Sequence, residues 1–248
     1  MKKSGYKNNP GFWRKKEPRV MGDMIGRPQA VDLLGEIEDN KILEAGCGTG
    51  YVARVLAQKG AKVFGCDKEE KMLNMAEKEE KENPLGVEYK LADITDTPYE
   101  DESFDSVLCV GVLMHSDVEE VKGFFKEARR ILRKNGFLVV SVTHPFLFTP
   151  LSPSRKNGKN WVKHNSIDDK PYTESQQFEE IYYDIDGEPF TANVYHHTIS
   201  TYLNSLVSSG LKIEQVNEVL LEKEHLLDGK FGKEYDYPAY FQFRAIKE

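Results

Sequence analysis

The chain has 248 residues, of which 39% are hydrophobic and 30% charged, and its formal net charge is −7. This balance is typical of a soluble globular chain with one sizeable core, and it disfavours disordered and membrane-embedded classes. The acidic total also argues against a general nucleic-acid binder, because such proteins usually carry a basic field that neutralises phosphates.

The cysteines and the N-terminus indicate the compartment. Cys47, Cys66 and Cys109 are odd in number and widely spaced, so they predict neither a disulfide framework nor a Cys-x-x-Cys metal or redox pair. The N-terminus lacks the apolar stretch of a signal peptide, and no later run approaches the length of a membrane span. We therefore expect a cytoplasmic protein that does not contact the membrane.

Residues 1–40 precede the first predicted strand and are expected to form an N-terminal cap or lid. They are rich in Lys, Pro, Gly and aromatic residues, and their pattern becomes helical over residues 27–37. The rest of the chain, residues 41–248, is expected to form one larger domain.

Residues 41–142 alternate short apolar or β-branched runs with longer amphipathic segments, the pattern of a doubly wound α/β domain with a Rossmann-like parallel sheet. The predicted strands are 41–45, 62–67, 87–91, 105–110 and 137–142, and the predicted helices are 51–58, 70–81 and 118–133. Asn135-Gly136 is the expected stop and turn after the last of these helices.

Residues 146–177 break this rhythm with several prolines and many polar side chains, and they are too long for an ordinary connection. Strands over 178–185 and 190–196 flank Asp186-Gly187, which is a hairpin signal. We therefore expect an insertion and hairpin over 146–197, after the fifth strand. A helix over 198–209 and strands over 211–221 and 240–246, paired antiparallel at one end of the sheet, close the chain.

Gly46, Gly48 and Gly50 alternate directly after the first predicted strand. Glycines there let the chain turn tightly and bring bare main chain against a ligand. The spacing departs from Gly-x-Gly-x-x-Gly, and Glu44 would repel an anion but favour a cation, so a pyrophosphate ligand is disfavoured. The turn predicts a nucleoside-bearing cofactor, and a turn without a ligand is the alternative.

Acidic residues follow the next two strands. Asp67 stands at the spacing expected for a carboxylate that accepts both ribose hydroxyls, although it could instead cap the following helix. Asp93 could accept a hydrogen bond from an adenine amino group with Ile94 beside the ring, or be a turn residue. Met72 could pack on the adenine face, or belong to the core.

Five segments in this order resemble the class I S-adenosylmethionine-dependent methyltransferases. They are Leu-Glu-Ala-Gly-Cys-Gly-Thr-Gly at 43–50, Gly-Cys-Asp at 65–67, Leu-Ala-Asp-Ile at 91–94, Phe-Asp-Ser-Val at 104–107 and Ile-Leu-Arg-Lys-Asn-Gly-Phe-Leu at 131–138. The resemblance implies a seven-stranded sheet with an antiparallel last strand and S-adenosyl-L-methionine as cofactor, with S-adenosyl-L-homocysteine as product.

The resemblance also implies cofactor-binding positions. Glu44 with the turn that includes Cys47 would hold the methionine portion, Asp67 the ribose, and Asp93 with Ile94 the adenine. The segment from Val110 to His115 would pass beneath the methyl group. Two further positions expected at the cofactor are Lys68 and Met72. Tyr6, Trp13 and Arg19 of the cap are also expected there, although these three could equally be packing or solvated surface residues.

The acceptor side offers four candidate catalytic residues. His144 directly follows the fifth strand, where a neutral imidazole could accept a proton, or it could orient the loop. His115 could act as acid or base, or serve the loop and cofactor pocket. Tyr195 and His196 lie in a Tyr-His motif similar to one in a subset of small-molecule methyltransferases, which commonly have arginine where His197 stands. Adjacent histidines on a strand face opposite ways, so we expect no metal site here.

Methyl transfer from a sulfonium is an in-line displacement, which needs a base only if the acceptor must lose a proton. The leading hypothesis is a methyltransferase that acts on oxygen or nitrogen of a small molecule, as a monomer or homodimer. One rival is a nucleic-acid (tRNA or rRNA) methyltransferase, suggested by the basic stretch 155–163 with Trp161, although nucleic acid is disfavoured as a partner. Protein methylation and a non-catalytic S-adenosylmethionine-binding protein stay open.

Overall fold

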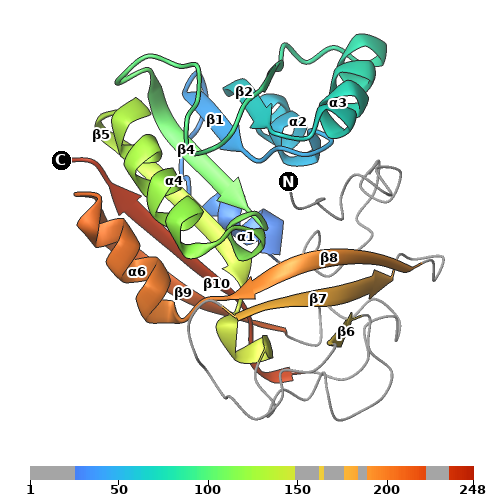
Figure 1. The fold of residues 1–248 in the computed structure, drawn as a ribbon. Coiled ribbons are helices and arrows are strands. Elements are labelled where there is room, and N and C mark those ends of the chain that lie inside the picture. Colours follow the sequence, from blue (N-terminus) through green and yellow to red (C-terminus); the bar gives the residue numbers. More distant parts are fainter. Residues whose placement is uncertain (1–25, 149–161, 165–175, 184–188, 222–234) are drawn as a thin grey trace.

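The computed structural model describes residues 26–148, 162–164, 176–183, 189–221 and 235–248. Its main sheet has seven strands in the order β3-β2-β1-β4-β5-β10-β9 (Figure 1). These strands are β1 (Lys41–Ala45), β2 (Lys62–Asp67), β3 (Glu88–Leu91), β4 (Phe104–Val110), β5 (Leu132–Thr143), β9 (Lys212–Leu221) and β10 (Tyr235–Ile246).

Strands β1 to β5 are parallel to one another, whereas β10 runs antiparallel to both β5 and β9. The expected doubly wound sheet with a reversed last strand is therefore confirmed. The order also places β1 and β4 side by side at its centre, where the strand order reverses. Ligands of open α/β sheets bind beside such a reversal, at the carboxyl ends of the strands.

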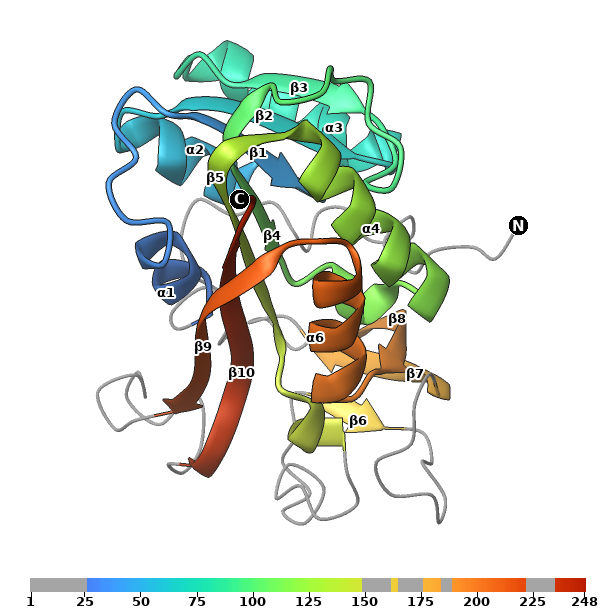
Figure 2. The ribbon, with the colours of Figure 1, turned by 90° about the vertical axis from the view of Figure 1, so that its left-hand side faces the viewer.

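Helices cover both faces of the sheet. They are α1 (Arg27–Asp32), α2 (Tyr51–Gln58), α3 (Glu70–Glu82), α4 (Val118–Ile131) and α6 (Ile199–Ser208), with 3-10 turns η4 (Leu113–His115) and η5 (Pro145–Phe148). Figure 2 shows α1 and α2 on one side of the sheet and α4 and α6 on the other. Each side has its own cluster of buried apolar side chains.

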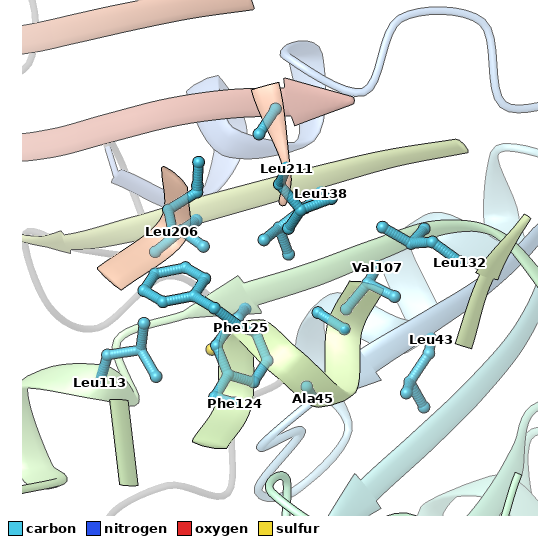
Figure 3. Packing of buried hydrophobic residues seen from close by; sticks show 14 of the residues in the cluster. Leu43, Ala45, Val107, Leu113, Phe124, Phe125, Leu132, Leu138, Leu206 and Leu211 are labelled. Atoms are coloured by element: carbon cyan, nitrogen blue, oxygen red, sulfur yellow. The ribbon is translucent and has the colours of Figure 1, made fainter. Parts of the chain in front are cut away.

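The larger cluster lies under α4 and α6 (Figure 3). Phe124 and Phe125 of α4 are buried against Leu138 of the sheet and Leu206 of α6. Each such side chain contributes about 1.5–3 kcal/mol when it is fully removed from water. The α4 helix begins at a capping box, in which Asp117 and Glu120 each accept from the other's backbone N–H. Packing and capping together fix α4 beside the end of β4.

A second, three-stranded sheet contains β6 (Val162–His164), β7 (Gln176–Tyr183) and β8 (Pro189–His196), all antiparallel. The hairpin expected around residues 186–187 is confirmed by the pairing of β7 with β8, although residues 184–188 lie outside the described residues. Strand β6 was not predicted. Figure 1 shows β8 next to the end of β4, and β8 is in contact with η4.

Element boundaries differ most from the sequence expectations at α1, at the junction of α4 and β5, and at β10, which begins at Tyr235 rather than at residue 240. The predicted helix 27–37 ends at Asp32, because the chain turns at Gly35, whose φ is 75°. The predicted helix 118–133 ends at Ile131, and β5 begins before Asn135-Gly136. Asn135, at φ 61°, therefore lies within β5 rather than ending a helix. Its N–H donates to the carbonyl of Lys247, so pairing with the end of β10 extends the strand.

Glu127 on α4 anchors the loop that follows β3. It is 7% exposed, and its Oε1 accepts hydrogen bonds from the N–H and hydroxyl of Thr97. Arg130 donates to both carboxylate oxygens, at 2.8 and 2.7 Å. Burial opposes the charge of Glu127, but these hydrogen bonds outweigh it and lower its pKa.

We expect Glu127→Ala to lower the free energy of unfolding by about 2–4 kcal/mol, because it leaves the buried donors of Thr97 unpaired and removes two hydrogen bonds of the partly buried Arg130. Urea denaturation measures the change. Glu119→Ala on the same helix is the control, since the Glu119 side chain is 76% exposed and its pair with Lys122 is worth less than about 1 kcal/mol. Equal losses in the two variants would contradict an anchoring role for Glu127.

Candidate cofactor and acceptor site

The carboxyl ends of β2, β1 and β4 are adjacent in the sheet and bring the predicted site residues to one edge. The turn from Gly46 to Gly50 follows β1, Asp67 ends β2, and Val110 ends β4. Asp93 follows β3, the next strand outward. These predicted residues therefore share one edge, as the sequence analysis expected.

The three glycines of the turn all have positive φ, 76°, 54° and 78° for Gly46, Gly48 and Gly50. The N–H groups of Gly46 and Cys47 both donate to the carbonyl of Cys66, which ties the turn to β2. A Cβ at Gly46 would collide with Val112, and one at Gly48 would lie 3.3 Å from the Cε of Met72. The turn thus requires glycine both for its dihedrals and for close packing.

Asp67 holds the turn through main-chain hydrogen bonds. Its Oδ2 accepts from the N–H of Gly48 at 2.8 Å, and its Oδ1 accepts from the N–H of Glu69 at 2.9 Å. Burial raises the pKa of Asp67 against these hydrogen bonds. The neighbouring Lys68 lies 3.5 Å from Glu120 at the surface. Asp67 therefore combines a helix-start contact with a fixed carboxylate at the edge.

Glu44 is 4% exposed and points back into the domain. Its Oε2 accepts a hydrogen bond from the N–H of Ala53 at 2.6 Å. Ala53 lies in the first turn of α2, whose N-cap is Gly50 and offers no side-chain acceptor. Burial raises the pKa of Glu44 to about 8, and the charge of Arg27 acts in the opposite direction. The carboxyl thus replaces the missing cap, and its expected contact with a cationic ligand stays a prediction.

Asp93 forms a local turn beyond β3. Its Oδ1 accepts from the N–H and the hydroxyl of Thr95, at 2.9 and 2.8 Å. Ile94 is partly buried and packs against the larger core cluster. The turn fixes the direction of the Asp93 carboxylate, while its contact with adenine stays a prediction.

The segment after β4, residues 111–116, is the post-β4 loop. Gly111 has φ 70°, and a Cβ there would meet nothing within 4 Å, so the loop begins beside open space. Its N–H donates to the carbonyl of Ser141 on β5. Val112 then packs on Gly46, and the Thr143 hydroxyl donates to the sulfur of Met114 at 3.2 Å. The loop therefore joins the glycine turn to the end of β5.

His144 follows β5 as predicted, but both ring nitrogens are engaged. Nδ1 accepts from the N–H of Phe146 at 3.1 Å, so Nε2 carries the proton and donates to Glu218 at 3.0 Å. The ring is 4% exposed and stands edge-on to Phe241. Burial lowers the pKa of His144, against the effect of Glu218. This geometry favours the loop-orienting role over proton transfer.

The other predicted acceptor-side residues lie where β8 meets the post-β4 loop. His115 Nδ1 donates to the carbonyl of Asn193 on β8, at 2.8 Å. Tyr195 is partly exposed, and its ring stacks on that of His197. His196 is 3% and His197 1% exposed. The structure thus brings His115 and the Tyr-His motif together, and places His144 beside β9 and β10.

Two residues near α1 were missed by the sequence analysis. Arg27 begins α1 close enough to Glu44 to affect its pKa. The Nε2 of Gln242, on β10, donates to the carbonyl of Gly26 at 2.7 Å and to Ser141 Oγ at 3.0 Å, which fixes the start of α1 on the sheet. No local motif marks either residue, and the contact of Gln242 with Gly26 joins positions 216 apart in the chain. The predicted cap residues Tyr6, Trp13 and Arg19 lie outside the described residues.

Within the described ranges, no helix is long and apolar enough to cross a membrane. The same part of the chain contains no group of three or more His, Cys, Asp or Glu residues that could hold a metal ion.

Comparisons with known proteins agree with this geometry. Residues 43–140 match a family model described as a methyltransferase domain. An uncharacterised protein of Haemophilus influenzae is 27% identical over 93% of this chain and 90% of its own length. Demethylmenaquinone methyltransferase of Thermotoga maritima is 35% identical over 48% of this chain, and the match spans about half of that enzyme (50%).

A solved S-adenosylmethionine-dependent methyltransferase from Mesorhizobium loti has a TM-score of 0.66 and 24% identity. The match covers 92% of this chain and 98% of the other, and it concerns the fold.

The strand order and the glycine turn define an open α/β domain in which bare main chain is available to a ligand at the carboxyl edge of the sheet. The matched family model identifies residues 43–140 as a methyltransferase domain, and the fold is similar to that of the solved S-adenosylmethionine-dependent methyltransferase from Mesorhizobium loti. S-Adenosyl-L-methionine stays the predicted cofactor of this domain. The residues present fit this group, since the edge offers a glycine turn, a fixed carboxylate at Asp67 and the open side of Gly111.

Gly50→Ala is expected to destabilise the protein more than Gly86→Ala. Both glycines have positive φ, 78° and 83°, so each alanine costs about 1–2 kcal/mol in backbone conformation. Only at Gly50 would the new Cβ collide with Tyr89, while nothing lies within 4 Å at Gly86. The collision adds about 1–3 kcal/mol. Urea denaturation tests this, and equal losses would contradict it.

The buried, neutral state of His144 predicts a pH dependence. Its pKa is lowered in the folded protein, so below the ordinary histidine pKa of about 6.5 the unfolded chain binds more protons. Stability is therefore lost as the pH falls. We expect the free energy of unfolding to drop less between pH 7.5 and 5.5 in His144→Gln than in the native protein. Parallel pH dependence in both proteins would refute this.

Proposed function

We propose that the protein transfers the methyl group of S-adenosyl-L-methionine to an oxygen or nitrogen of a small-molecule acceptor. The observation that carries this proposal is the shared edge formed by the glycine turn, Asp67 and the post-β4 loop, with the second sheet next to it. The relative named demethylmenaquinone methyltransferase supports a small-molecule acceptor. The net charge of −7 weighs against nucleic acid as the acceptor.

The cofactor's parts each have a proposed partner. The Asp67 carboxylate accepts the ribose hydroxyls through lone pairs not used by its two main-chain donors. Asp93 receives the adenine amino group through Oδ2, since Thr95 occupies Oδ1. Arg27, whose charge acts on Glu44, binds the carboxylate of the methionine portion, whereas the sequence predicted Arg19 of the cap at the cofactor. These assignments extend the edge from β3 to α1.

The cofactor supplies a methyl group activated by its bond to a positively charged sulfur. The acceptor atom forms a bond to this carbon as the carbon–sulfur bond breaks, and an O–H or N–H acceptor also loses a proton. The protein's part is to align the acceptor and exclude water. To act as a base, His144 would first have to break the hydrogen bond that Nδ1 accepts from the Phe146 N–H. Alignment of the acceptor therefore contributes more to catalysis than proton transfer to His144.

Cofactor affinity gives the first test, with two ligands that differ only in one part. S-adenosylhomocysteine has the amino-acid portion, whereas methylthioadenosine lacks it. We expect Asp67→Ala to weaken both ligands by about tenfold to a hundredfold, the loss of charge-assisted hydrogen bonds worth about 1.5–3 kcal/mol. Arg27→Gln should weaken S-adenosylhomocysteine by a similar factor and leave methylthioadenosine unchanged. Isothermal titration calorimetry measures both.

Glu82→Gln, an exposed change at the end of α3, is the matched control and should bind both ligands like the native protein. An Asp67→Ala variant with native affinity would refute the ribose assignment. If the native protein bound neither ligand, the cofactor assignment itself would fail. Incubation with methyl-labelled cofactor and fractions of a metabolite extract then identifies the acceptor, and label found only in RNA or protein fractions would refute the small-molecule proposal.

A further inference from the structure

Two histidines join the post-β4 loop to the second sheet by reciprocal hydrogen bonds. His115 of the loop donates from Nδ1 to the carbonyl of Asn193 on β8, at 2.8 Å. His197, just after β8, donates from Nε2 to the carbonyl of Ser116 in the loop, also at 2.8 Å. Each segment therefore donates one hydrogen bond from an imidazole N–H and accepts one at a main-chain carbonyl. We call these two hydrogen bonds the imidazole clasp.

The His197 ring is held on several sides. It is 1% exposed, lies parallel to the Tyr195 ring with 6.0 Å between centroids, and meets the buried Tyr202 ring edge-on at 5.4 Å. These contacts fix the direction of the Nε2–H bond. A hydrogen bond shielded from water in this way is stronger than an exposed one, and breaking it leaves a buried carbonyl unpaired.

The other end of the same loop contacts the carboxyl edge of the main sheet, where the cofactor is proposed to bind. We call this edge the cofactor edge. Val112 packs on Gly46 of the glycine turn, and Met114 accepts from Thr143 at the end of β5. Six consecutive residues, 111–116, thus contact the glycine turn and are tied to β8. A change in the mobility of the glycine turn can therefore reach the second sheet through these six residues.

We propose that His115 and His197 are positioning residues, whose clasp couples occupancy of the cofactor edge to the docking of β8 on the post-β4 loop. This inference rests on the proposed function, since β7 and β8 would form the acceptor side. Coupling of this kind is reciprocal. Cofactor that orders the glycine turn also stabilises β8 against local opening, and an acceptor docked on β8 in turn favours bound cofactor.

Hydrogen exchange tests the coupling in the whole protein. With saturating S-adenosylhomocysteine, we expect the amides of β8 to exchange about tenfold more slowly than without it. The leucine variants His115→Leu and His197→Leu remove one donor each, and this slowing should fall below about twofold in either. His115→Asn and His197→Gln place an amide N–H near the positions of Nδ1 and Nε2, so they should restore most of it.

Two matched controls separate the clasp from its surroundings. Asn193→Ala and Ser116→Ala change the side chains but keep the accepting carbonyls, so both should retain the native slowing. A merely structural role for the histidines would lower β8 protection equally with and without ligand. The clasp is supported only if the leucine variants lose the ligand-dependent slowing of β8 exchange and the amide variants restore it.

The outcomes distinguish this inference from the proposed function. If S-adenosylhomocysteine binds but β8 exchange in the native protein is unchanged, the coupling is wrong while the function stands, and this result needs no variant to fold. Leucine variants that keep the full slowing would likewise overturn it. If the native protein does not bind S-adenosylhomocysteine, both the coupling and the cofactor assignment fail.

Discussion

The close contact between Gly46 and Val112 is the constraint on which the site depends. A side chain at Gly46 would occupy the space of the Val112 methyl groups, so the glycine turn and the post-β4 loop meet only because Gly46 has none. From Val112 the loop continues to Met114 and the end of β5, and then to β8. One main-chain approach therefore brings the cofactor edge and the second sheet together.

The buried Glu44 and the partly buried Asp67 organise the same edge through main-chain donors. Glu44 accepts from the start of α2, and Asp67 accepts from the glycine turn and from the residue before α3. Burial raises the pKa of both carboxyls, because these hydrogen bonds only partly offset desolvation. Such an edge offers carboxyl oxygens as acceptors for the hydroxyls of a ribose.

The histidines show how tertiary contacts decide the role of a residue type. In the sequence, His115 and His144 are catalytic candidates from their places after strands, and His196 from the Tyr-His motif. In the structure, the nitrogens of His144 are taken up by Phe146 and Glu218, and His115 binds a main-chain carbonyl of β8. Position in the chain could predict the neighbourhood of these rings, but not which acceptors would reach them.

The sequence by itself determined the central sheet and the glycine turn. Strands 41–45 and 62–67 and helix 51–58 are as predicted, because apolar periodicity and glycine conformation are local properties. Only the tertiary structure decided the start of β5, the direction of Glu44, the place of Arg27 and the imidazole clasp. The start of β5 and the imidazole clasp depend on residues far apart in the chain, such as His197 and Ser116, which are 81 positions apart. Such pairings follow from how the layers pack, which local patterns do not contain.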